Sequence, residues 1–148
     1  KKIYSEELFS EKFIKDLHKR MYGEVWKWAG TFRTSEKNLG IKCYLIPVQL
    51  KQLLDDATFW YENNVFAPEE FAVRFKHQLV SIHCFANGNG RHSRLMADLI
   101  MEKLYQQSFL TWGGSSLVKS NEKRKAYIKA IQKADRQDLK QLIIFAKS

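Results

Sequence analysis

The chain has 148 residues, and because its 25 Lys and Arg outnumber its 16 Asp and Glu, its formal net charge is +9. Hydrophobic residues make up 45% of the chain and aromatic residues 14%, and there are only two prolines, a composition that excludes an intrinsically disordered protein. No apolar run reaches the roughly 18 residues of a membrane span, and no signal peptide opens the sequence. We therefore expect a cytoplasmic protein without membrane contact, in which residues 1–148 form a single domain.

The two cysteines, Cys43 and Cys84, are too few for a disulfide framework and do not form a Cys-x-x-Cys pair. We expect both to be free thiols in a reducing compartment. The positive charge favours polyanionic ligands, either ATP in a local cleft or nucleic acid over a wider surface. Charge alone does not separate these two possibilities.

Along the chain, Ser10 is placed to cap a first helix that ends near Gly23, because apolar residues follow it at helical spacing: Phe13, Ile14, Leu17 and Met21. The segment 31–46 differs, since two short β-prone runs flank a polar stretch that contains Asn38 and Gly40. This pattern predicts a hairpin. Taken alone, it would be a plain surface hairpin.

Pro47 and Pro68 are each well placed to open a helix. The buried face of the first of these helices is predicted from Leu50, Leu53, Leu54, Ala57 and Tyr61, and that of the second from Phe71, Phe75, Leu79 and Ile82. The second helix delivers His83 at its end.

The stretch 83–94, His-Cys-Phe-Ala-Asn-Gly-Asn-Gly-Arg-His-Ser-Arg, carries the chemistry. Its imidazole can accept a proton near neutral pH, and Gly88 and Gly90 allow consecutive N–H groups to form a nest for an anion. Apolar residues at helical spacing follow from Leu95 to Leu104, so the turn should open a helix whose N-terminus favours phosphate. Arg91 and Arg94 can both reach past that helix end.

The rest of the chain predicts a loop at 111–116, a helix from about 120 to 131, and a last helix that begins near Asp138 with a capping box. The total is about seven helices with one hairpin. The fold class is therefore mainly α.

The stretch 83–94 resembles the signature of the Fic (Fido) family, His-x-Phe-x-(Asp or Glu)-Gly-Asn-(Gly or Lys)-Arg-x-x-Arg. The segment 20–34 is similar to the one that leads into the flap hairpin of Fic domains. The stretches 79–98 and 109–117 look like a bacterial subgroup called mobile mystery protein B. This resemblance implies the Fic fold, with its flap at about 31–46.

The resemblance implies transfer of AMP from ATP to a Ser, Thr or Tyr hydroxyl of a target protein, with Mg²⁺ bridging the phosphates. His83 would be the general base, and Phe85 would anchor the loop in the core. The implied phosphate-binding residues are Gly88, Asn89, Gly90, Arg91 and Arg94. The flap would pair with the backbone of the target. In this family an inhibitory helix can regulate the site, and here it could precede Lys1 or lie on a separate antitoxin.

Asn87 departs from the family pattern, which has an acidic metal ligand at that position. An amide oxygen can ligate Mg²⁺ but brings no charge, so we expect weaker metal binding at Asn87. The segment 58–63 also matches an inhibitory pattern of the family. Because it lies inside a predicted core helix, we interpret its aromatic residues as core residues instead.

Other interpretations of these residues are weaker. His77 and His83 are six residues apart, a spacing that does not fit a zinc pair on one helix face. Cys84 lacks a third group that would orient it with His83 as a thiol nucleophile. We interpret His18, His77 and His92 as structural.

Two other functions remain open. The first is another Fic chemistry, such as transfer of UMP, phosphate or phosphocholine, or removal of AMP, because Asn87 would alter metal handling. The second is a basic module of a toxin–antitoxin type that binds nucleic acid or a partner without catalysis, with the residues around 119–129 as a possible binding face.

Overall fold

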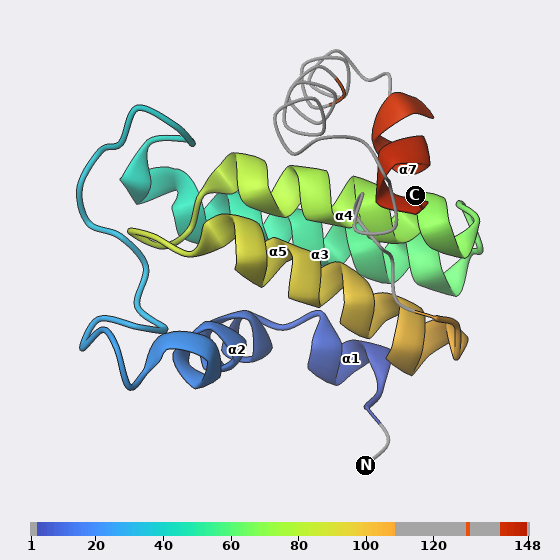
Figure 1. The fold of residues 1–148 in the computed structure, drawn as a ribbon, viewed down its shortest axis with the longest axis horizontal. Coiled ribbons are helices and arrows are strands. Elements are labelled where there is room, and N and C mark those ends of the chain that lie inside the picture. The colour runs from blue at the N-terminus through green and yellow to red at the C-terminus, as the bar shows by residue number, and fades with distance from the viewer. Residues whose placement is uncertain (1–2, 109–129, 131–139, 148) are drawn as a thin grey trace, which may run out of the picture.

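A computed structural model describes residues 3–108, 130 and 140–147 of the chain, and every regular element in this part is helical (Figure 1). The mainly α architecture predicted from the sequence is confirmed. In chain order the elements are α1 (Ser5–Leu8), α2 (Glu11–Tyr22), a 3₁₀ turn η1 (Cys43–Leu45), α3 (Ile46–Glu62), α4 (Pro68–Ile82), α5 (Asn89–Leu99), a π-helical turn η2 (Ile100–Leu104) and α7 (Lys140–Lys147).

The predicted helix starts are confirmed at three places. The hydroxyl of Ser10 accepts a hydrogen bond from the Phe13 N–H at 3.1 Å and so caps α2. Pro47 lies in the first turn of α3, and Pro68 is the first residue of α4. Proline fits these positions because the first N–H groups of a helix have no partner within it.

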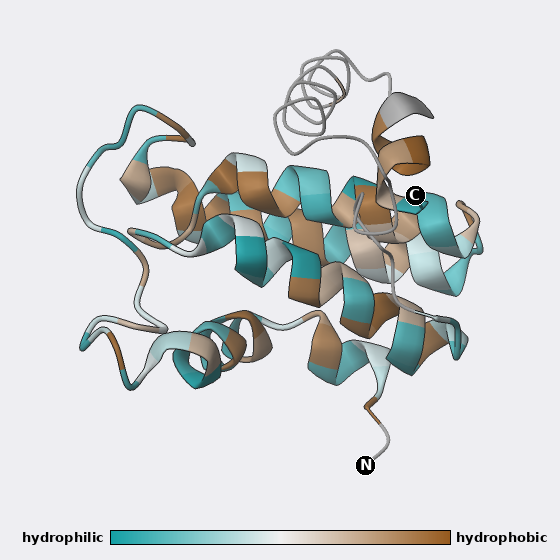
Figure 2. Cartoon of the chain, viewed as in Figure 1, coloured by the Kyte–Doolittle hydropathy of each residue, from teal (hydrophilic) through white to brown (hydrophobic). Residues whose placement is uncertain are grey.

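Helix α4 contributes the largest share of the buried core among the described residues. Phe71 and Phe75 are fully buried on it, and Leu79 and Ile82 continue the same face toward the candidate site. Full burial of a phenylalanine side chain stabilises the fold by roughly 2 to 3 kcal/mol. Helices α3, α5 and α7 pack against α4. In Figure 2, hydrophobic and hydrophilic stretches alternate along α3, α4 and α5, as expected for helices with one buried face.

The hairpin predicted over 31–46 does not form as a pair of strands. Residues 31–42 run without regular structure, and the second β-prone run becomes η1 and the start of α3. The backbone groups that would pair across a hairpin have other partners: the Arg33 N–H donates to the Cys84 carbonyl at 2.9 Å, and the Ile41 carbonyl accepts from the Arg33 side chain. Tertiary contacts have therefore overridden β-propensity.

The last predicted helix is confirmed in part as α7. The predicted loop at 111–116 and nearly all of the predicted helix at 120–131 lie outside the described residues. Within the described part of the chain, no helix is both long and apolar enough to cross a bilayer.

Candidate functional site

The stretch 83–94 begins with a loop of residues 83–88, here called the motif loop, and continues into α5. This loop joins two helices that pack side by side, α4 and α5 (Figure 1). His83 ends α4 in the left-handed conformation, with φ 58° and ψ 61°, and Gly88 precedes α5 with φ 80° and ψ 9°. Two left-handed residues thus bracket a tight connection. Glycine adopts this conformation without cost, whereas at His83 it requires support from the surrounding structure.

Asn89 fixes the shape of the loop from inside. Its side-chain oxygen accepts a hydrogen bond from the Phe85 N–H at 3.0 Å, and its side-chain nitrogen donates to the Phe85 carbonyl at 2.8 Å. Phe85 is fully buried in the core, in line with the anchoring role that the resemblance implies. Because Asn89 is itself buried and both the oxygen and the nitrogen of its side-chain amide are hydrogen-bonded, it supports the loop from within.

His18 supports the same loop from α2. Its Nδ1 accepts from the Gly30 N–H at 2.9 Å, so its proton is on Nε2, which donates to the Asn87 carbonyl at 3.0 Å. Burial lowers the pKa of His18, although the bond to the Asn87 carbonyl opposes this shift. A neutral imidazole therefore joins the segment before Arg33 to the motif loop.

A cavity of about 820 Å³ opens beside the loop. It brings together His83 and most of the predicted phosphate-binding residues, namely Gly88, Asn89, Gly90 and Arg91, along with Asn87. Arg94 is half-buried on α5 and does not line this cavity. The remaining walls come from other segments: Tyr22, Trp26, Leu39, Gly40, Val80 and Ser81.

An aromatic wall closes one side of the cavity. The rings of Tyr22 and Trp26 stack with centroids 4.6 Å apart, and Trp28 stacks on Trp26 at the same spacing. Tyr22 lies so close to the loop that a Cβ on Gly88 would come within 2.5 Å of its ring. The loop and this wall therefore fit together only because residue 88 has no side chain.

The electrostatics of the site keep the imidazole of His83 neutral. Burial lowers the pKa of His83, and the positive charges of Arg33 and Lys37 lower it further. The imidazole is thus held in the form that can accept a proton. In contrast, burial raises the pKa of the neighbouring Cys84 thiol to about 12, which excludes a thiolate nucleophile near neutral pH.

The described residues around Asn87 do not fit a metal ion held by the protein. The side-chain oxygen of Asn87 accepts the Gly88 N–H at 2.8 Å, so it stabilises its own turn. No Asp or Glu is among the described residues that line the cavity. In residues 3–108, 130 and 140–147, no three His, Cys, Asp or Glu side chains are grouped closely enough to hold a metal. Because Mg²⁺ sites rely on one or two carboxylates, a metal here would depend on oxygens of the ligand.

The structural role predicted for the other histidines agrees with their burial. His18 and His92 are fully buried, and His77 is nearly so. The sequence did not, however, identify His18 and Arg33 as supports of the motif loop. The only sequence signal was their place in or next to a segment similar to the one that leads into the family flap, which assigns no role to either residue.

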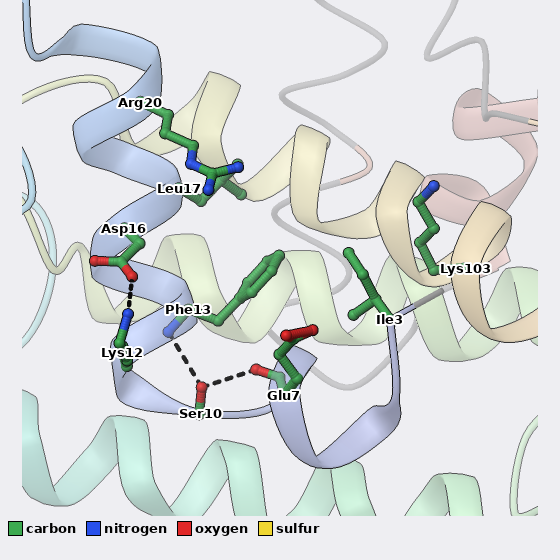
Figure 3. Close-up of a pocket in the computed structure, with 9 residues that line it drawn as sticks. All are labelled: Ile3, Glu7, Ser10, Lys12, Phe13, Asp16, Leu17, Arg20 and Lys103. Atoms are coloured by element: carbon green, nitrogen blue, oxygen red, sulfur yellow. Dashed lines mark hydrogen bonds and ion pairs between the residues drawn. The ribbon is translucent and has the colours of Figure 1, made fainter. Parts of the chain in front are cut away.

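A second cavity, of about 500 Å³, lies between α1, α2 and η2 (Figure 3). Apolar side chains of Ile3, Phe13 and Leu17 line it, and an ion pair between Lys12 and Asp16 lies on its wall. It shares no lining residue with the cavity at the motif loop. We therefore assign the candidate site to the motif loop.

Comparison with known proteins places this site in a family. A sequence model of the Fic/DOC family matches residues 8–101. The chain is 25% identical over 147 residues to "Protein adenylyltransferase Fic" of Aedes aegypti, covering 97% of this chain and 28% of that protein. It therefore spans about a quarter of the length of that relative.

Solved structures share the fold. A structure of residues 134–508 of Fic-1 from Caenorhabditis elegans superposes with a TM-score of 0.75 at 25% identity, covering 93% of this chain and 39% of that one. A Fic-domain signaling protein from Bacteroides thetaiotaomicron superposes with a TM-score of 0.78 at 17% identity, covering 97% of this chain and 60% of that one. The mobile mystery protein B subgroup stays a prediction. The chain belongs to the Fic/DOC family.

Proposed function

We propose that this chain is a nucleotidyltransferase domain, extending over residues 1–148, that moves AMP from ATP to a hydroxyl of a target protein. The observation that carries the proposal is that one cavity holds both a neutral imidazole, His83, and the glycine-rich turn at the start of α5. The name of the Aedes aegypti relative, a protein adenylyltransferase, supports the same activity.

In the proposed step, His83 takes the proton of a Ser, Thr or Tyr hydroxyl of the target. The hydroxyl oxygen then attacks the α-phosphorus of ATP, and the bond to the β-phosphate breaks, so that pyrophosphate leaves. One proton, one new P–O bond and one broken P–O bond balance the reaction. Such a reaction needs little covalent help from the protein and depends mostly on positioning and charge.

The phosphate chain would lie against the start of α5. Gly88 would let the turn approach the phosphates closely, while its own N–H stays bonded to the Asn87 side chain. Asn89 and Gly90 would present backbone N–H groups there, and the partial positive charge of the helix N-terminus would add to them. Arg91 lines the cavity and would contact the phosphates. Arg94 lies three residues farther on, and we assign it to the γ-phosphate at the end of the chain. Any bridging Mg²⁺ would be held mainly by phosphate oxygens, with at most the uncharged amide of Asn87 from this loop.

The proposal is tested by comparing the purified chain with His83→Ala. Each protein is incubated with a protein extract and ATP labelled in the adenine ring, and the proteins of the extract are analysed by mass spectrometry for labelled and unlabelled adducts. Lys51→Ala serves as a surface control, because Lys51 is exposed and forms an ion pair with Asp55 away from the cavity. We expect transfer by the unmodified chain and the control, and none by His83→Ala, with ATP binding retained in all three.

Two results would contradict the proposal. Transfer by a folded His83→Ala protein would remove His83 from the role of base. A stable adduct whose mass is not that of AMP would replace AMP transfer with another Fic chemistry, such as transfer of UMP, phosphate or phosphocholine.

A further inference from the structure

The side chain of Arg33 is fully buried at the junction between the motif loop and the 34–42 loop. Its guanidinium donates hydrogen bonds to four main-chain carbonyls. Nε donates to His83, Nη1 to Ser35, and Nη2 to both Ile41 and Ile82. One side chain thus binds backbone on both sides of the candidate site.

The positive charge of Arg33 is stabilised mainly by main-chain carbonyl groups and not by a carboxylate. The carboxylate of Glu36 is 4.0 Å away and about half exposed, and its other oxygen accepts the Cys43 N–H. Ile82 and His83, in contrast, end α4, where helix carbonyls lack partners within the helix and carry partial negative charge. A planar guanidinium with five donors is suited to bind several such carbonyls at once, which an ammonium group is not.

Arg33 also holds the backbone around His83 in an unusual conformation. Its side chain binds the His83 carbonyl, and its own N–H donates to the next carbonyl, that of Cys84, at 2.9 Å. Two successive carbonyls are therefore fixed by one residue. This matters because a left-handed residue other than glycine is strained and persists only where neighbouring groups hold it.

The 34–42 loop closes against the same turn. Gly40 has φ 92°, and a Cβ on it would lie 2.5 Å from the His83 Cβ and 2.9 Å from Nη2 of Arg33. Gly40 also lines the cavity, as does its neighbour Leu39. The loop that borders the cavity therefore packs directly on the residue that carries the imidazole.

On the basis of the proposed function, we propose that Arg33 is a positioning residue that locks the backbone of His83 to the 34–42 loop, so that the base and the loop beside it keep one fixed geometry. Arg33 does not line the cavity and is not a ligand for the nucleotide. Its role is thus separable from that of the phosphate-binding residues.

The charge of Arg33 adds a second effect on the same imidazole. Among the described residues, the charged groups near His83 are Arg33 and Lys37 from the segment before η1, and Arg91, which lines the same cavity from α5. Removing the charge of Arg33 should raise the pKa of His83, whereas replacing Arg33 by lysine should keep it nearly constant. Geometry and charge can therefore be tested with two variants.

The experiment compares Arg33→Lys, which keeps the positive charge but loses the planar guanidinium, with Arg33→Met, which loses both. Arg74→Met is the matched control, because Arg74 is also a largely buried arginine but stacks on Phe66 and lies outside the cavity. Three readouts are taken: NMR titration of the His83 ring, order parameters of the Gly40 and Ile41 N–H groups, and ATP affinity with the transfer rate. The His83 signal is assigned from its loss in His83→Gln.

We expect both Arg33 variants to lose order at Gly40 and Ile41 and to slow transfer about 10- to 100-fold while ATP affinity stays unchanged. The pKa of His83 should rise in Arg33→Met only, because that variant alone removes the positive charge. Arg74→Met should change none of these. If Arg33→Met does not fold, the order parameters and the transfer rate of Arg33→Lys decide whether Arg33 has the proposed positioning role.

Wild-type order at Gly40 and Ile41 in a folded Arg33 variant would overturn the proposal, as would an unchanged His83 pKa in folded Arg33→Met. These NMR readouts do not depend on activity. If the unmodified chain transfers no AMP, the proposed function fails, whereas the role of Arg33 is still decided by the titration and the order parameters.

Discussion

The imidazole of His18 lies nearly parallel to the ring of Phe85, with 3.8 Å between the ring centroids and 17° between their planes. Phe85 belongs to the motif loop and His18 to α2, so this contact joins segments that are far apart in the sequence. The two hydrogen bonds of His18, from the Gly30 N–H and to the Asn87 carbonyl, add direction to the contact. Helix α2 therefore supports the motif loop through both stacking and hydrogen bonds.

The first prediction concerns the hydrogen bonds of His18. His18→Phe keeps an aromatic ring against Phe85 but leaves the Gly30 N–H and the Asn87 carbonyl without partners, so it should lower the free energy of unfolding by about 2 to 4 kcal/mol. His18→Gln keeps a donor and an acceptor and should cost less. Urea unfolding followed by tryptophan fluorescence measures both values. Equal stability of His18→Phe and the unmodified chain would show that stacking alone supports the loop.

The second prediction separates two glycines of the motif. Gly88→Ala places a Cβ against the Tyr22 ring in a backbone conformation with φ 80°, so it should destabilise the protein by about 2 kcal/mol or more. Gly90 lies in the first turn of α5, and no atom of the described residues lies within 4 Å of a Cβ added there. Gly90→Ala should therefore be neutral or stabilise the protein by up to about 1 kcal/mol. Thermal unfolding compares the two, and similar losses at both positions would contradict the account.

The third prediction concerns the buried amide of Asn89. Asn89→Ala removes both bonds to Phe85 and should destabilise the protein by about 2 to 4 kcal/mol. Asn89→Asp keeps the acceptor for the Phe85 N–H but places a second oxygen opposite the Phe85 carbonyl, so it should also be destabilising at neutral pH. Acid should partly restore Asn89→Asp, because the protonated carboxyl can donate to that carbonyl. Urea unfolding at two pH values tests this difference from Asn89→Ala, which acid should not restore.

The fourth prediction is a loss of stability in acid that arises from His92. Burial lowers the pKa of His92 to about 4, from an ordinary value of 6.5, and its Nε2 pairs with the Ile14 carbonyl at 2.9 Å. Between these two pH values the unfolded chain binds more protons, so the free energy of unfolding should fall as the pH drops below about 6.5. The loss from His92 should reach about 3 kcal/mol below pH 4. Urea titrations across this range measure the slope, which His92→Gln should reduce; an unchanged slope would exclude His92 as its source.

Much of the fold follows from local sequence signals. Ser10, Pro47 and Pro68 mark helix starts because each satisfies or removes an N–H group that has no partner in the first turn. The face of α4 that carries Phe71 and Phe75 follows from helical spacing. The position of His83 at the end of α4, next to the turn that opens α5, was predicted for the same reasons.

The supports of the site were not predictable in this way. Arg33 lies in a run whose composition is typical of a β-strand, but its role depends on carbonyls of Ile82 and His83 that are about 50 residues away. The Asn87 carbonyl that His18 binds is 69 residues away. Such contacts leave no periodic signal in one sequence. The same long-range bonds explain why the expected hairpin is an irregular loop.

The measurement that tests the central claim most directly is calorimetry of ATP binding, with and without Mg²⁺, on the unmodified chain and on Asn87→Asp. If the loop is an anion site without a metal ligand of its own, ATP should bind the unmodified chain in both conditions. Mg²⁺ should then strengthen binding more in Asn87→Asp, which restores a carboxylate. Absence of ATP binding in all four titrations would contradict the assignment of this cavity as a nucleotide site.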